Sequence, residues 1–202
     1  MHTTTAHFSV HAVRMDAAMN GQVLHLGRFA SVDAQFSPGE TATQAIDADK
    51  RLLYSRLHTA GHVLGAAVRH LLQERVPGFE ELKASHFPDS AACEFQGLIE
   101  GGWKEAIQRR VDECVGRAML VQIEWWDEAD FRAEGLGRLV PDREAMGMAE
   151  GEKFRVVRIV GEGGEVYPCG GTHVDTTEEC GKTTVRKISR SKGTSRVSYA
   201  VE

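Results

Sequence analysis

The 202-residue sequence lacks the features that mark a secreted, membrane-spanning or nucleic-acid-coating protein. No stretch approaches the run of about 18 apolar residues that a spanning helix needs, so we expect no membrane partner. The opening MHTTTAHFSVHAV has neither a basic segment nor a long apolar one, so no signal peptide is visible. The formal net charge of −5 argues against bulk electrostatic binding of nucleic acid, although it leaves room for a local basic patch.

Cysteine is also sparse, with four residues that are widely spaced and form no CxxC pair. Without a secretion signal, free thiols in a reducing compartment are the expected state, and we expect a cytoplasmic protein. A chain of this length can bury a sizeable core, so it needs neither disulfides nor a metal merely to fold. Only the spacing of possible ligands can therefore indicate a metal site.

The hydrophobic pattern mixes helices and strands without a regular βαβ alternation. It predicts an α+β fold, a largely antiparallel sheet flanked by helices, with a small β-rich N-terminal segment (1–46) and a larger domain (47–202). Helical periodicity is present over 47–76 and 102–119. Strand patterns fall at 92–99, 120–127, 153–161, 164–174, 182–190 and 195–202.

Two histidines stand four residues apart in the middle of the first predicted helix, within LHTAGHVL (57–64). This spacing puts His58 and His62 on one helix face, one turn apart. The pair alone does not distinguish two metal ligands from two polar residues on a mostly apolar surface. Because position 59 is threonine, the pair does not form the HExxH motif of zinc proteases.

The segment PCGGTH (168–173) supplies a second pair with the same spacing, Cys169 and His173, and its two glycines favour a tight turn. Considered alone, the cysteine could be a small buried hydrophobe and the glycines could serve a hairpin. Together with the helical pair, however, these residues offer one thiolate and three imidazoles, the number and type of ligands that Zn²⁺ takes in tetrahedral sites. The predicted zinc ligands are His58, His62, Cys169 and His173.

HTAGHVL and CGGTHVDTTEECG together resemble the editing domain shared by alanyl- and threonyl-tRNA synthetases and by the free-standing AlaX proteins. The likeness extends to the entry AIDADKRLLYSRLHTAGHVL and to the closing KTTVRKISRSKGTSRVSYAV, and covers roughly residues 40–202. Two places depart from the family pattern. Cys180 replaces an aliphatic residue and is either core filler or a further ligand, and Ala84 replaces the glycine of a Lys-Gly-Ser-like turn.

The resemblance implies a free-standing aminoacyl-tRNA hydrolase that deacylates mischarged tRNA(Ala), with Ser-tRNA(Ala) favoured over Gly-tRNA(Ala). A pocket that hydrogen-bonds the serine hydroxyl would reject alanine, which leaves buried polar groups unpaired. Two alternatives stay open: a zinc hydrolase of the same fold acting on another aminoacyl ester or thioester, and a non-catalytic, zinc-stabilised RNA-binding module. The zinc could activate water or position the substrate, and four protein ligands favour positioning.

The residues expected nearest the substrate are Ser85 in the Lys-Ala-Ser turn, Thr172 between the loop ligands, and His86, since histidine has an unperturbed pKa near neutrality and could assist proton transfer. Ser85 could instead cap the turn, and His86 could be an exposed loop histidine. The mischarged tRNA is expected on residues 182–196, which contain no acid; the alternative is a solvated hairpin with a guarded edge strand. The candidate RNA-binding residues are Lys182, Arg186, Lys187, Arg190, Lys192 and Arg196.

Overall fold

The computed structural model describes residues 1–3, 6–16 and 22–202, and the chain divides into two compact units, Met1–Ala48 and Asp49–Glu202. The smaller unit is built on an antiparallel pair, β1 (Phe8–Met15) and β2 (Val23–Phe29). Three aromatic rings pack against one another in this unit, those of Phe8, Phe29 and Phe36.

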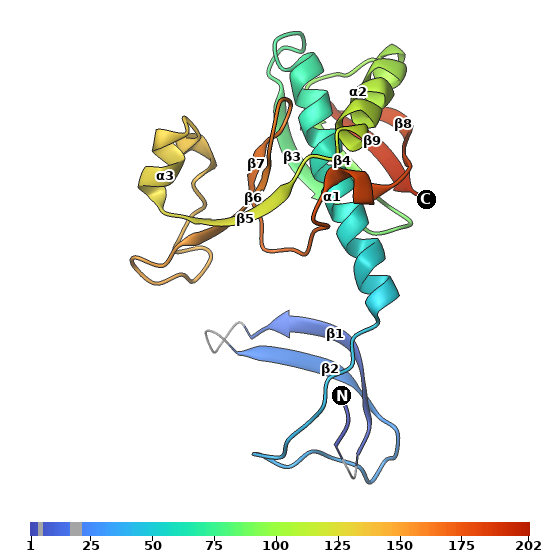
Figure 1. Ribbon diagram of the computed structural model, residues 1–202, viewed down its shortest axis with the longest axis vertical. Helices are drawn as coiled ribbons and strands as arrows, with labels where there is room; N and C mark the ends of the chain where they lie inside the picture. The colour runs from blue at the N-terminus through green and yellow to red at the C-terminus, as the bar shows by residue number, and fades with distance from the viewer. Residues whose placement is uncertain (4–5, 17–21) are drawn as a thin grey trace. The chain divides into compact units, whose positions relative to one another are not determined.

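The larger unit combines helices with two antiparallel sheets, which confirms the predicted α+β class (Figure 1). Its helices are α1 (Ala48–Leu72), α2 (Lys104–Gly116) and α3 (Glu128–Ala133), with short 3₁₀ helices η1 (Gly101–Trp103), η2 (Gly137–Leu139) and η3 (Thr177–Cys180). One sheet has the order β3 (Glu80–Ser85), β4 (Ala92–Gln96), β9 (Thr194–Val201), β8 (Thr183–Ser191). The other has the order β5 (Val121–Trp126), β6 (Phe154–Ile159), β7 (Val166–Pro168).

Helix α1 runs through the centre of the larger unit (Figure 1). Every residue from Thr59 to Arg69 is buried. Its apolar side chains pack with those of α2 and of the four-stranded sheet in one core. Because this stretch is enclosed, its polar side chains must find partners inside the protein, at a cost if they do not. Three such side chains, Thr59, His62 and Arg69, organise the site described below.

Strand β3 is a structural element that the hydrophobic pattern does not predict. Its sequence, EELKAS, contains no β-branched or aromatic residue. The strand forms because it pairs antiparallel with β4, with an irregularity between Glu81 and Ala84. Tertiary pairing thus overrides local propensity here. The consequence is that Glu81 and the following His86 lie beside α1.

A second, smaller hydrophobic cluster joins α3 to the β5-β6-β7 sheet, and its members are Trp126, Phe131, Phe154, Val156 and Val166. Within the described residues, no helix has both the length and the apolar character needed to cross a membrane.

Candidate metal centre

The four predicted metal ligands converge, although the two pairs are more than 100 positions apart in sequence. His58 and His62 project from α1, and Cys169 and His173 from the loop after β7, so that one ligand atom of each lies within 4.8 Å of the others. Cys169 Sγ is 3.3 Å from His58 Nε2 and 3.5 Å from His173 Nε2. The rings of His58 and His173 have centroids 4.1 Å apart. The arrangement could hold a single metal ion.

The loop between Cys169 and His173 approaches α1 so closely that a side chain at one of its glycines would displace the His58 ring. A Cβ atom at Gly171 would come within 2.2 Å of His58 Cε1, whereas Gly170 faces open space. The Thr172 backbone hydrogen-bonds the His58 ring, and Arg155 donates to the Cys169 carbonyl. These contacts fix the loop against the helix.

Buried hydroxyl groups on α1 orient the same loop. Thr59 Oγ1 lies 3.1 Å from His173 Nδ1 and accepts the Val174 backbone N–H at 3.2 Å. With Nδ1 held in this way, His173 turns Nε2 toward Cys169. Ser55 donates to the Thr172 hydroxyl at 2.9 Å. Such outer contacts orient metal ligands, and neither Thr59 nor Ser55 had a sequence signal beyond its place beside the histidine pair.

Burial keeps the donors of the cluster neutral. Desolvation, and then the neighbouring charges of His58, Arg155 and His86, lower the pKa of His173 to about 3. Desolvation is also the main reason why the pKa of His62 lies well below its ordinary value. It raises the pKa of the Cys169 thiol. Neutral imidazole is the metal-binding form, and a bound cation would favour the thiolate.

One observation tests whether the cluster suits a metal. His62 Nδ1 is buried and has no hydrogen-bond partner within the described residues. An unpartnered buried nitrogen is costly. A soft donor set of three imidazoles and one thiol, with no carboxylate, fits Zn²⁺ better than Mg²⁺ or Ca²⁺.

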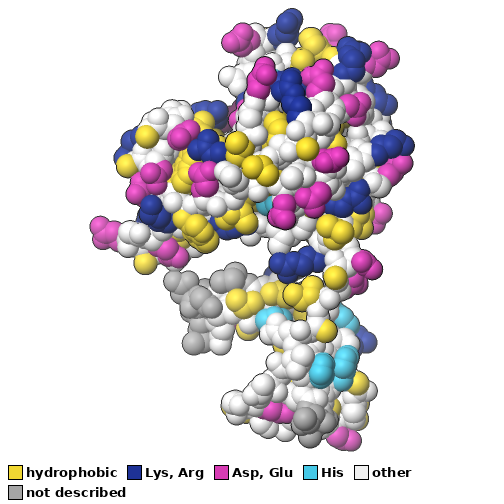
Figure 2. All heavy atoms as spheres, in the orientation of Figure 1, with side chains coloured by type: hydrophobic (Ala, Val, Ile, Leu, Met, Phe, Trp, Pro, Cys, Tyr) yellow, Lys and Arg dark blue, Asp and Glu magenta, His cyan; other side chains and the backbone are white. Residues whose placement is uncertain are grey.

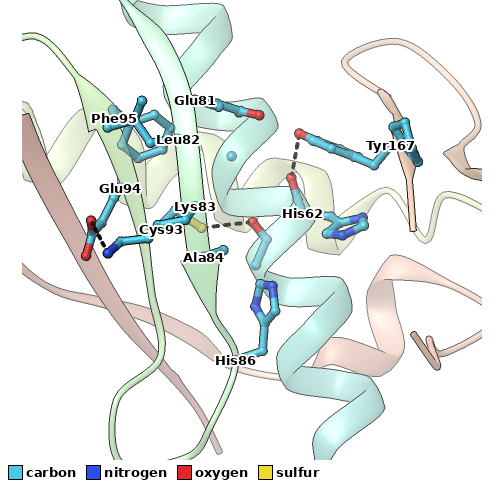
Figure 3. Close-up of a pocket in the computed structure, with 13 residues that line it drawn as sticks. His62, Glu81, Leu82, Lys83, Ala84, His86, Cys93, Glu94, Phe95 and Tyr167 are labelled. Atoms are coloured by element: carbon cyan, nitrogen blue, oxygen red, sulfur yellow. Dashed lines mark hydrogen bonds and ion pairs between the residues drawn. The ribbon is translucent and has the colours of Figure 1, made fainter. Parts of the chain in front are cut away.

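A cavity of about 290 Å³ opens beside the cluster, between α1, the β3-β4 strands and Tyr167 (Figure 3). His62 and His86 both line it. His86 packs on Gly61 of α1, where a Cβ atom would come within 2.3 Å of His86 Cε1. His86 therefore lies against α1 beside the cluster, with its ring centroid 4.5 Å from that of His58.

The hydrogen bonds of His86 define its tautomer. The Tyr199 hydroxyl donates to the Leu57 carbonyl at 2.8 Å and lies 2.8 Å from His86 Nδ1. Since the only hydroxyl proton is used on Leu57, Nδ1 must carry the proton and donate to Tyr199, which leaves the lone pair on Nε2. Desolvation, followed by the charge of His58, lowers the pKa of His86 to about 4. At neutral pH His86 is therefore an uncharged acceptor.

The other two candidate substrate-facing residues have partners within the protein. Ser85 Oγ lies 3.1 Å from Ser90 Oγ, and Thr172 accepts from Ser55. Among the described residues, the cavity lining includes His86 but neither Ser85 nor Thr172. Cys180 is buried in the hydrophobic core, where desolvation raises its thiol pKa to about 12, and it lies outside the group of four.

The six predicted RNA-binding side chains are all exposed on or beside the β8-β9 hairpin. Arg186, Lys187 and Arg196 line a groove of about 560 Å³ together with residues 88–91 and Tyr199. Lys182 pairs with Glu202 at 2.8 Å. On the face of the larger unit seen in Figure 2, acidic and basic side chains are interspersed. Tyr199, which lines this groove, contacts His86, which lines the cavity, so these two side chains connect the groove with the cavity.

Comparison with known proteins shows which domains and proteins this chain is similar to. Residues 154–198 match the model of the threonyl and alanyl tRNA synthetase second additional domain. The chain is 30% identical over 182 residues to an alanine–tRNA ligase of Methanococcus maripaludis, covering 90% of this chain and 19% of the ligase. It is 27% identical over 186 residues to the alanyl-tRNA editing protein AlaX-L of Pyrococcus horikoshii, covering 89% of this chain and 41% of that protein. The chain thus spans less than half the length of either relative.

Proposed function

We propose that the chain is an alanyl-tRNA editing domain of the AlaX type, as its similarity to these proteins supports. It then hydrolyses the ester that joins a wrong amino acid to tRNA(Ala), with serine favoured over glycine. The observation that carries this proposal is the convergence of four metal-ligating side chains beside a small cavity. The cavity volume of about 290 Å³ is at the lower end of the usual range for ligand pockets, which suits a small aminoacyl end.

The proposed cofactor is Zn²⁺, held by His58, His62, Cys169 and His173. The neutral imidazoles, the single thiol and the unpartnered nitrogen of His62 support this choice. Such an ion would supply a fixed positive charge that orients the substrate, since a site with four protein ligands is typical of positioning rather than of water activation. Thr59 and the Thr172 backbone would keep His173 and His58 in place.

The chain itself offers a base for the hydrolytic water. We assign this role to His86, whose Nε2 carries a lone pair because Nδ1 keeps its proton and donates a hydrogen bond to the Tyr199 hydroxyl oxygen. As the water oxygen attacks the ester carbonyl carbon, its proton passes to Nε2. The ribose oxygen then leaves and takes that proton. No covalent acyl-enzyme is needed.

The two hydroxyl residues are proposed to act by positioning. Thr172 is tied to Ser55 on α1 and supports the His58 contact of its own backbone. Ser85 is tied to Ser90, which closes the loop that carries His86. Loss of either hydroxyl should loosen a loop rather than remove a group that touches the substrate.

For the tRNA we propose a path along the β8-β9 hairpin. Arg186, Lys187 and Arg196 would contact backbone phosphates in the groove that they line together with Tyr199. The remaining cations of the hairpin, Lys182, Arg190 and Lys192, would extend the contact. Several phosphate contacts make binding strongly salt-dependent.

A deacylation assay on Ser-, Gly-, Ala- and Thr-charged tRNA, at enzyme concentrations far below substrate, tests the proposal. The expected result is rapid release of serine, slower release of glycine, and intact Ala-tRNA. If metal-loaded protein leaves Ser-tRNA(Ala) and Gly-tRNA(Ala) intact while still binding tRNA, the chain is a binding module. RNA-independent cleavage of small esters would instead indicate another hydrolase of the same fold.

A further inference from the structure

The cavity beside the metal centre has a second polar end, at Glu81 on β3. In Figure 3, Glu81 and His86 lie at opposite ends of the cavity-lining residues. Arg69 donates to Glu81 Oε2, but Glu81 Oε1 is buried and has no hydrogen-bond partner within the described residues. A buried carboxylate oxygen without a donor is costly unless a ligand supplies one.

The charges around Glu81 do not balance. Arg69 bridges two carboxylates, because it also donates to Glu165 Oε2 at 2.6 Å. One guanidinium against two carboxylates leaves a formal charge of −1. His70 lies 3.0 Å from the other oxygen of Glu165 and adds positive charge only when protonated. Burial raises the pKa of Tyr167 and of the Cys93 thiol, so both are neutral here. Desolvation raises the pKa of Glu81 itself, and the exposed Arg138 adds a positive charge nearby without forming an ion pair with it. The unpartnered oxygen of Glu81 suits a cationic hydrogen-bond donor.

Gly65 lets this oxygen approach the backbone of α1 closely. A Cβ atom at position 65 would come within 2.9 Å of Glu81 Oε1 and 3.2 Å of the Tyr167 hydroxyl. That hydroxyl donates to the His62 carbonyl at 3.3 Å, so its proton is not available to Glu81. Gly61, where His86 packs, precedes Gly65 by one helical turn, a rise of about 6 Å along the axis.

We propose that Glu81 is the subsite for a primary ammonium group, and that its ligand is the α-ammonium of the aminoacyl ester; this inference rests on the proposed hydrolase function. An α-nitrogen lies two bonds from the ester carbonyl, so with one N–H···O contact of about 2.9 Å an ammonium at Glu81 holds the carbonyl roughly one helical turn away. The hydrolytic water then lies between that carbonyl and His86. A substrate whose carbonyl lies at the His86 end thus places its ammonium at Glu81.

The test combines a change in the substrate with a change in the enzyme. Ser-tRNA(Ala) and N-acetyl-Ser-tRNA(Ala) are compared on the wild type, Glu81→Gln and Glu165→Gln. Acetylation removes the positive charge, so the wild type should lose about ten- to a hundredfold in kcat/KM. Glu81→Gln should reduce kcat/KM for Ser-tRNA(Ala) by a similar factor. Acetylation of the substrate should reduce kcat/KM of this variant little further. Glu165→Gln is the matched control, since it also removes a carboxylate from Arg69 but Glu165 does not line the cavity. In this variant, acetylation should reduce kcat/KM by the same factor as in the wild type.

An equal acetylation penalty in the wild type and in Glu81→Gln would overturn the inference. The inference would also be overturned if Glu81→Gln no longer discriminated between serine and alanine but still lost kcat/KM on acetylation. Glu81 would then contact the side-chain hydroxyl of serine. If Glu81→Gln does not fold, Gly65→Ala replaces it, because its methyl group fills the space beside Oε1. It should raise KM for the free-amine ester only.

A binding measurement separates this inference from the proposed function. Calorimetry with 3′-deoxy-3′-(seryl)aminoadenosine, which has an uncleavable amide, and with its N-acetyl form needs no turnover. If the wild type hydrolyses no ester but binds the free-amine analogue about ten- to a hundredfold more tightly, and Glu81→Gln does not, the subsite stands while the function fails. Equal affinity of the wild type for both analogues refutes the subsite.

Discussion

The two ends of the cavity beside α1 are both polar and largely buried, yet they accommodate burial in opposite ways. At the metal end, desolvation leaves His62 and His173 uncharged. At the Glu81 end, Arg69 pairs with two carboxylates and opposes the desolvation that raises the pKa of Glu81. Each end nevertheless has one buried atom without a partner, His62 Nδ1 and Glu81 Oε1. Neutral donors suit a metal ion that brings its own charge, whereas a surplus negative charge suits an organic cation.

The largest expected effect comes from removing ligands at the metal end. His58→Ala combined with Cys169→Ala should reduce the zinc content from near one equivalent to background, and deacylation should fall at least a hundredfold, the loss seen for outer contacts alone. Elemental analysis of protein purified without added metal measures the first. Cys180→Ala is the control, since this thiol lies in the core outside the cluster. A double variant that keeps its zinc would contradict the ligand assignment.

At the opposite end, Arg69→Met should act on stability rather than on metal content. It leaves Glu81 and Glu165 facing each other without their shared cation, and breaking a buried charge network in this way costs about 3–5 kcal/mol in the free energy of unfolding. Urea denaturation of the zinc-loaded protein measures the loss. An unchanged midpoint would mean that Arg69 does not hold the two carboxylates together.

Between the two ends, His86→Asn should lower kcat by about a hundredfold, which is the lower range for loss of a general base, while zinc content stays unchanged. Tyr199→Phe should cost less, because it removes the group that fixes the His86 tautomer but leaves the base itself. If His86→Asn retains full activity, the hydrolytic water has another base.

The metal-free protein should lose stability as the pH falls from about 6.5 toward 4. An unfolded histidine titrates near 6.5, whereas the folded pKa is about 4 for His86 and about 3 for His173. In this window the unfolded chain binds more protons, so the free energy of unfolding decreases with decreasing pH, and above the window these residues contribute no slope. Denaturation of chelator-treated protein at several pH values tests this. His86→Asn should flatten the curve.

The smallest expected effect lies on the β8-β9 hairpin. Lys187→Gln should weaken tRNA binding at low salt and reduce the slope of log K against log salt by about 1. Lys153→Gln is the matched control, because that lysine lies near Asp127 and Asp130 rather than on the hairpin. Equal slopes for the two variants would place the tRNA elsewhere.

The metal end could be predicted from the sequence because each half of it is local. A helix fixes the geometry of His58 and His62, and the glycines between Cys169 and His173 indicate a turn. The Glu81 end has no comparable signal. It combines three elements, α1, β3 and the segment before β7, through Arg69, Glu81 and Glu165, whose spacing in sequence carries no pattern.

His86 shows where local information stops. Its place in a loop favours an exposed histidine over a functional one. Its burial and tautomer depend on Gly61 and on Tyr199, which is 113 positions away in the sequence. Strand β3 likewise depends on a contact outside its own sequence, since EELKAS forms a strand only through pairing with β4. Contacts made across the fold decide both cases.

X-ray absorption at the zinc edge of the purified full chain tests the central claim most directly. We expect one zinc per chain, with one sulfur ligand at about 2.3 Å and three nitrogen ligands at about 2.0–2.1 Å. A zinc-free protein, or a first shell of oxygen atoms without sulfur, would contradict it.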